Sequence, residues 1–207
     1  MISSVPAKGR VDRADYDVII SLVPQSSKVL DLGCADGELL LRLKREKNCA
    51  VSGVEIDKEL VLKGIEKGLC VLEADIDQGL KDYPDSSFDV VMLSQTIQIT
   101  RRPRSVLREM LRVGKMGIVS TPNFGHLNVR FQLGILGKMP KTKDIPYEWH
   151  ETPNIHMVTI NDFRRFCREE NIKIEREIFL GNGRRTVHFL PNILARTAIW
   201  LLRKDEL

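Results

Sequence analysis

Residues 29–37 read VLDLGCADG, and this stretch predicts the fold of the chain. Its apolar run ends at a pair of glycines, Gly33 and Gly37, and a helical pattern that carries Leu39 and Leu43 follows immediately. A strand, a tight glycine turn and a helix in this order form the opening unit of an α/β nucleotide-type fold. Glycine takes backbone angles that are closed to other residues, and free N–H groups at the start of a helix suit a polar ligand.

The turn differs from the dinucleotide-binding fingerprint G-x-G-x-x-G, because Ala35 and Glu38 stand where that motif needs glycine. Asp36 also places a negative charge where a pyrophosphate would lie. A second apolar strand, residues 50–55, ends at Glu55, whose carboxylate can accept both hydroxyls of a ribose. A glycine turn and a ribose-binding acid, without a place for a pyrophosphate, favour S-adenosylmethionine (SAM) as the ligand.

These two motifs resemble those of the class I SAM-dependent methyltransferases. The first motif of that family matches residues 31–37, with Ala35 at the usual middle glycine, and the second matches Glu55. In the family an acidic residue after the third strand lies beside the adenine, a role that falls here on Asp75, with Ile76 as an apolar neighbour of the ring. The resemblance implies that SAM or S-adenosylhomocysteine is bound by Asp31, Gly33, Cys34, Gly37, Glu55, Ile56, Asp75, Ile76, Ser94 and Gln95.

The alternation of strands and helices predicts a parallel sheet with helices on both faces. Apolar runs predict strands at 69–74, 88–93 and 118–120, the last entered by a turn at 114–117. A helix is expected at 103–113, and Asp12 or Asp15 is expected to cap the first helix. The predicted fold is a three-layer α/β sandwich, class I SAM methyltransferase-like (Rossmann-like), with seven mostly parallel strands and an antiparallel last strand.

The end of the chain predicts two more strands and a helix. Residues 172–180 read as a sixth strand, 181–183 as a hairpin-type turn and 185–190 as the seventh strand. A basic amphipathic pattern at 191–203 predicts a packed C-terminal helix. We expect one methyltransferase-like domain over residues 1–207, with a core at about 8–190, a lid or recognition insertion at 122–158 and a C-terminal helix at 191–207.

The predicted insertion begins with an ambiguous stretch, because residues 127–137 fit both a strand and a helix, of which we expect the helix. Residues 138–158 read as a long irregular loop, which is typical of a lid or a recognition loop. The candidate general bases for a methyl transfer are His126, Tyr147, His150 and His156. A histidine in a loop is more often a plain hydrogen-bonding residue. No metal is expected, because these histidines with Glu148 match no metal-binding spacing.

Composition limits the class of protein. With 207 residues, 43% hydrophobic and 29% charged, the chain reads as a soluble globular protein. A net charge of +4 does not demand a nucleic acid. The strand that ends at Ser94 also lacks the Asn-Pro-Pro-aromatic motif of many nucleic-acid methyltransferases, so nucleic-acid methylation is not expected.

The location predicted for the protein is the cytoplasm, with no membrane contact. No apolar run is long enough to cross a bilayer, and residues 1–10, a loose lead-in, lack the apolar core of a signal peptide. The last four residues, 204–207, spell an ER-retention tag, which we interpret as chance without a signal peptide. No C-x-x-C pair occurs, so buried reduced thiols are expected at Cys34, Cys49, Cys70 and Cys167.

A narrower resemblance covers roughly residues 8–180. The stretches LSQTIQ (93–98), RRP (101–103), EMLRVG (109–114), PNFGH (122–126), PYEW (146–149) and TPNIH (152–156) resemble the methionine-biosynthesis protein MetW family. This resemblance implies a methyltransferase fold and an association with homoserine O-acyltransferase, without an established methyl acceptor. Nothing is carried over to the tail after residue 181.

Two functional hypotheses follow. The first is a SAM-binding accessory protein that docks on homoserine O-acyltransferase and supports or tunes its activity. The second is a SAM-dependent methyltransferase with an unidentified small-molecule acceptor, which would align the acceptor with the activated methyl group and exclude water. The candidate docking surfaces are the face with Arg101, Arg104, Arg108 and Arg112, the stretch 127–137 and the loop 138–158.

Overall fold

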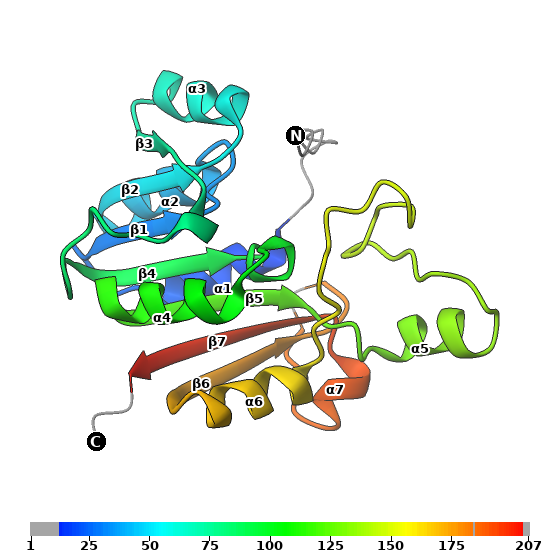
Figure 1. Cartoon of the computed structure of the whole chain (residues 1–207). Helices are drawn as coiled ribbons and strands as arrows, with labels where there is room; N and C mark the ends of the chain where they lie inside the picture. Colours follow the sequence, from blue (N-terminus) through cyan, green and yellow to red (C-terminus); the bar gives the residue numbers. More distant parts are fainter. Residues whose placement is uncertain (1–12, 184, 205–207) are drawn as a thin grey trace.

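The computed structural model describes residues 13–183 and 185–204. Within these residues a seven-stranded sheet has the order β3-β2-β1-β4-β5-β7-β6 (Figure 1). β7 is antiparallel to both of its neighbours, and the other neighbouring strands are parallel, as predicted. The strands are β1 (Lys28–Leu32), β2 (Ala50–Glu55), β3 (Cys70–Glu73), β4 (Phe88–Ser94), β5 (Gly114–Pro122), β6 (Ile172–Leu180) and β7 (Thr197–Lys204).

Helices cover both faces of this sheet (Figure 1). α1 (Ala14–Leu22) and α2 (Glu38–Lys47) share one apolar core with strands β1, β4 and β5. α4 (Pro103–Val113) and α6 (Ile160–Glu169) share a second core on the other face. The remaining elements are α3 (Lys58–Glu66), α5 (Leu127–Gly134), α7 (Pro191–Leu194) and the 3-10 turns η1 (Ile76–Gln78) and η2 (Ile97–Ile99). The three-layer arrangement confirms the predicted fold class.

Local side-chain chemistry sets several helix starts. Asp57 caps α3 by accepting a hydrogen bond from the backbone N–H of Glu59 at 2.9 Å, and Thr159 caps α6 by accepting from the N–H of Asp162. The prediction that Asp15 caps α1 is wrong. Asp15 lies inside the helix, because its carboxylate accepts hydrogen bonds from Arg13 instead. Asp12, the other predicted cap, lies outside the described residues.

The predicted sixth strand is confirmed as β6, but the predictions of a seventh strand at 185–190 and of a C-terminal helix are wrong. Residues 185–190 make a single bridge, between Leu180 and Thr186, and residues 197–204 form a strand where a helix was expected. β7 inserts between β5 and β6, and its successive side chains enter the apolar cores on both sides of the sheet, so both of its faces are covered. A strand covered on both faces reads as one apolar run, which periodicity alone cannot distinguish from a buried helix.

Smaller corrections concern β5 and one cysteine. The expected turn at 114–117 is already part of β5, which starts at Gly114 directly after α4. Cys70 is exposed, because it lies on β3 at the edge of the sheet, whereas Cys34, Cys49 and Cys167 are buried as predicted. The helix expected in the insertion is confirmed as α5.

Two interpretations concern the chain ends. The lead-in at residues 1–10 lies outside the described residues, as does the retention-like tag except for Lys204. Across residues 13–183 and 185–204, every helix is too short or too polar to cross a bilayer.

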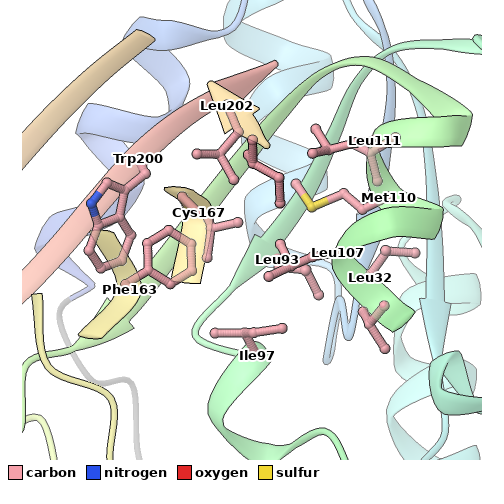
Figure 2. Close-up of a cluster of buried hydrophobic side chains, with 14 of the residues drawn as sticks. Leu32, Leu93, Ile97, Leu107, Met110, Leu111, Phe163, Cys167, Trp200 and Leu202 are labelled. Carbon is pink, nitrogen blue, oxygen red and sulfur yellow. The ribbon is translucent and has the colours of Figure 1, made fainter. Parts of the chain in front are cut away.

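The core beneath α4 and α6 depends on aromatic packing (Figure 2). Trp200 of β7 is fully buried, and its ring stacks on Phe163 of α6 with centroids 4.0 Å apart. The indole N–H of Trp200 donates to Glu177 on β6 at 3.2 Å, so the polar end of the ring is also satisfied. Trp200 therefore joins α6, β6 and β7.

Replacing Trp200 by alanine tests the corrected end of the chain. A fully buried tryptophan costs about 3–5 kcal/mol of unfolding free energy when truncated. We expect a loss of that size for Trp200→Ala in urea denaturation. The matched control is Trp149→Ala, whose side chain is 71% exposed and whose change should stay within about 0.5 kcal/mol. A loss at position 200 as small as that of the control would contradict the buried strand.

Candidate functional site

The candidate site lies where β1, β2 and β4 end. These strands are parallel neighbours, so their carboxyl ends meet at one edge of the sheet. In open α/β sheets, ligands bind in the crevice outside the carboxyl ends of the strands. The structure thus brings together the predicted residues that follow these three strands.

The glycine turn after β1 needs glycine for steric reasons. Gly33 has φ +76°, and a Cβ atom there would lie 2.6 Å from a side-chain carbon of Thr96. Gly37 has φ +75° at the start of α2. The backbone N–H groups of Gly33 and Cys34 donate to the carbonyl of Val54 at 2.8 and 3.1 Å, which ties the turn to β2.

Glu55 is the link between the β1 turn and the end of β2. Its carboxylate accepts three backbone N–H groups: Ala35 at 2.9 Å, Ile56 at 2.8 Å and Asp57 at 3.0 Å. Glu55 is buried, whereas the side chain of its neighbour Ile56 is exposed. One carboxylate oxygen accepts only the N–H of Ala35, so it keeps a lone pair for a further donor.

Asp31 carries an unsatisfied oxygen inside the site. Its side chain is 2% exposed, and its Oδ1 has no hydrogen-bond partner among the described residues. Burial raises the pKa of Asp31 to about 7, with the charges of Glu55 and Asp15 acting in the same direction and that of Arg13 acting against them. A buried unpaired acceptor of this kind is rare in native proteins and fits a ligand that donates hydrogen bonds.

Arg13 is a site residue that the sequence reasoning missed. It donates two hydrogen bonds to Asp15, at 2.9 and 2.8 Å, and one to the hydroxyl of Ser94 at 2.8 Å. Its guanidinium also lies over the ring of Tyr16. Arg13 thereby connects the start of α1 to the end of β4. No local pattern marks this residue, because its partner Ser94 is 81 positions away.

Two non-glycine residues at the site have left-handed backbone angles. Ala35 has φ 50° after β1 and Gln95 has φ 55° after β4. Such conformations cost about 1–3 kcal/mol and cluster at functional sites. The N–H of Gln95 donates to the carbonyl of Ser120 at 2.9 Å, which holds this residue in place.

The other predicted binding residues have structural contacts. Asp75 caps η1 by accepting from the N–H of Asp77 at 2.9 Å, and Ile76 packs against the apolar core. Burial raises the pKa of the Cys34 thiol, which keeps it neutral. Their roles toward a ligand remain predictions.

The candidate bases do not gather at one point. His126 caps α5 by accepting from the N–H of Asn128, and burial together with the charge of Arg196 lowers its pKa. His150 contacts the ring of Trp149, and burial raises the pKa of Tyr147. These contacts provide no oriented general base. Over the part of the chain that the structure describes, no three His, Cys, Asp or Glu side chains cluster as metal ligands would.

His156 alone returns close to the site elements. The N–H groups of Ile155 and His156 donate to the carbonyl of Gln98 at 2.9 and 3.0 Å. The Nε2 of His156 lies 3.0 Å from the carbonyl of Thr100. The loop 138–158 is thus anchored on η2, directly after β4.

The predicted arginine face is not uniform. Arg104 and Arg108 both pair with the buried carboxylate of Glu170, at 2.9 Å each. Arg112 turns toward Glu109 and Asp85 instead, because their carboxylates lie beside it. Arg112 therefore does not share the ion-pair partner of Arg104 and Arg108 on this face.

Solved structures define the class of this protein. A SAM-dependent methyltransferase from Mesorhizobium loti has a TM-score of 0.68 over 94% of this chain and 100% of that chain, at 15% identity. One from Archaeoglobus fulgidus has a TM-score of 0.65 over 94% and 92%, at 16% identity. The chain has the class I SAM methyltransferase-like fold.

Sequence comparison gives the family. The chain belongs to the methionine biosynthesis protein MetW family, whose match covers residues 13–202. The match extends through most of β7, past the limit of about residue 180 that the resemblance predicted. The bifunctional methionine biosynthesis protein MetXA/MetW of Rhodopirellula baltica is 34% identical over 93% of this chain and 33% of that protein. The chain spans from a third to under half the length of the curated relatives it matches.

The buried carboxyl of Asp31 predicts a pH effect that Asp31→Asn should remove. A pKa raised from 3.8 to about 7 stabilises the fold below pH 3.8, and that stabilisation is lost as the pH rises through about 7. Relative to the wild type, Asp31→Asn should gain up to about 4 kcal/mol of unfolding free energy between pH 4 and pH 8.

Urea denaturation at both pH values measures this gain. Asp89→Asn is the matched control, because the hydrogen bond and ion pair with Lys115 lower the pKa of Asp89 and keep its carboxylate ionised across this pH range. The stability that Asp89 contributes is lost only as the pH falls below 3.8, so the difference between this control and the wild type should stay nearly constant between pH 4 and pH 8. A pH-independent difference for Asp31→Asn would show that Asp31 is charged throughout.

Proposed function

We propose that this chain is a SAM-binding accessory protein of methionine biosynthesis that acts with homoserine O-acyltransferase. The observation that carries the proposal is the Rhodopirellula baltica relative, which is named MetXA/MetW and of which this chain matches a third. We interpret the MetXA part as the acyltransferase. Two activities in one polypeptide act together, so the separate chains are expected to associate. The proposal includes a cytoplasmic location, where the cysteines stay reduced.

The geometry of the site supports SAM as the ligand. The free lone pair of the Glu55 carboxylate would accept a ribose hydroxyl, next to the turn of Gly33, Cys34 and Gly37. The unpaired Oδ1 of Asp31 would accept from the ammonium group of the methionine part. The loop after β4, with Ser94 and Gln95, would close the site from the other side, and Asp75 with Ile76 would lie by the adenine. When bound, SAM supplies an activated methyl group on a sulfonium.

SAM would act as a signal in this proposal. A ligand changes an association only if it binds the free and associated forms with different affinity. The loop 138–158 is anchored on η2, which follows β4 at the candidate site. A ligand that orders this side of the site can therefore change the conformation of the loop 138–158, which extends outside the site.

Truncation of Glu55 tests the SAM site. Charge-assisted hydrogen bonds are worth roughly 1.5–3 kcal/mol, so Glu55→Ala should weaken SAM binding about tenfold to a hundredfold in calorimetry. Glu66→Ala, on the exposed surface of α3, is the matched control and should bind SAM as the wild type does. Unchanged affinity in Glu55→Ala would remove Glu55 from the site.

The accessory role is tested with homoserine O-acyltransferase from the same organism. We expect a higher turnover or a higher melting temperature of the enzyme when this chain is added. SAM should change the dissociation constant of the complex about 5-fold to 150-fold, and the complex should change the affinity for SAM by the same factor. No complex on a sizing column and no effect on turnover would reject the role.

A further inference from the structure

We infer that the arm formed by residues 127–139, which contains α5, is the surface that docks on the acyltransferase. This inference rests on the proposed function and selects one surface for it. Figure 1 shows α5 projecting beyond the end of β5, away from the sheet. The arm is therefore held out from the two apolar cores of the fold.

The arm exposes more apolar surface than its length requires. Ile135 is 74% exposed and Phe131 49%. The large hydrophobic side chains of the arm that are exposed in this way are Leu127, Phe131, Leu133, Ile135, Leu136 and Met139. Between residues 127 and 137 the sequence holds one charged residue, Arg130. Depletion of charge around aromatic and aliphatic side chains is typical of the core of a protein–protein interface, and contiguous exposed apolar surface marks interaction sites.

The arm is built to hold this surface in place. Asn123 at its base donates to the carbonyls of Asn192 and Ala195 and accepts from the N–H of Gly125. The guanidinium of Arg130 turns back to the carbonyl of Gly125 at 2.6 Å. At the other end, the side chain of Gln132 bonds to both backbone groups of Lys141. The polar side chains at both ends of the arm are thus bonded to backbone groups beside it, and the large apolar side chains named above remain exposed.

The choice of the acyltransferase as the partner that covers the arm rests on the MetXA/MetW relative and on a comparison with the arginine face. A permanent partner requires an apolar interface, and the MetXA/MetW relative carries its partner in the same polypeptide. The rival arginine face is less suitable, because Arg104 and Arg108 already share the carboxylate of Glu170. A second copy of this chain, or closure of the arm over its own SAM site, would be the other uses of such a surface.

The test compares full-length variants in binding to the acyltransferase and to SAM. The double variant Phe131→Ser with Ile135→Ser should weaken binding to the acyltransferase at least about 30-fold, as expected for the loss of interface anchors, and should bind SAM normally. The matched control is Leu62→Ser with Ile65→Ser on α3, where the side chains are 50% and 51% exposed. This control should bind both partners as the wild type does.

Each of the other outcomes overturns either this inference or the proposed function. If the arm variant binds the acyltransferase as tightly as the wild type does, the inference is wrong and the proposed function stands. Loss of SAM binding in the arm variant identifies the arm as a lid of its own site and also overturns the inference. If the wild type is a dimer, and the arm variant is a monomer that still binds the acyltransferase normally, the arm binds a second copy of this chain instead. Absence of any wild-type complex overturns the proposed function itself.

Discussion

The carboxylate of Glu55 is the contact on which the candidate site depends. It accepts the N–H of Ala35 from the turn after β1 and the N–H groups of Ile56 and Asp57 after β2. Because β1 pairs with β2, this contact fixes the turn after β1 against the end of β2. Without this acceptor, the three N–H groups would lose partly buried hydrogen bonds, which costs stability. The shape of the turn and the capacity to bind a ligand thus share one cause.

The charged groups around this turn are arranged at a cost in stability. Asp31 keeps an unpaired oxygen although it is buried, and Arg13, whose charge acts on it, is engaged by Asp15 and Ser94. Ala35 and Gln95 add backbone conformations that favour glycine. Natural proteins retain such local conflicts chiefly where function requires them. The apolar cores on the two faces of the sheet, with Trp200 and Phe163 in one of them, offset these costs away from the site.

The fold and the proposed role belong to different parts of the molecule. The solved SAM-dependent methyltransferases share this sheet and its helices at about 15% sequence identity. Similarity at this level shows the fold alone. The segment proposed to dock lies after β5, where α5 and the irregular loop to residue 158 leave the sheet and return to η2. The candidate bases in this segment serve as a cap or as loop contacts, so its prominent property is its exposed apolar surface.

The sequence by itself determined the sheet up to β5, the glycine turn, the position of Glu55 at the end of β2 and the family. These features depend on neighbours in the chain, whose periodicity and turn residues are visible in the sequence. The tertiary structure alone decided the position of β7, because a strand covered on both faces has no alternating pattern. It also decided the cluster of Arg13, Asp15 and Ser94, which joins distant residues. Burial and long-range pairing are properties of the folded chain, and no local pattern encodes them.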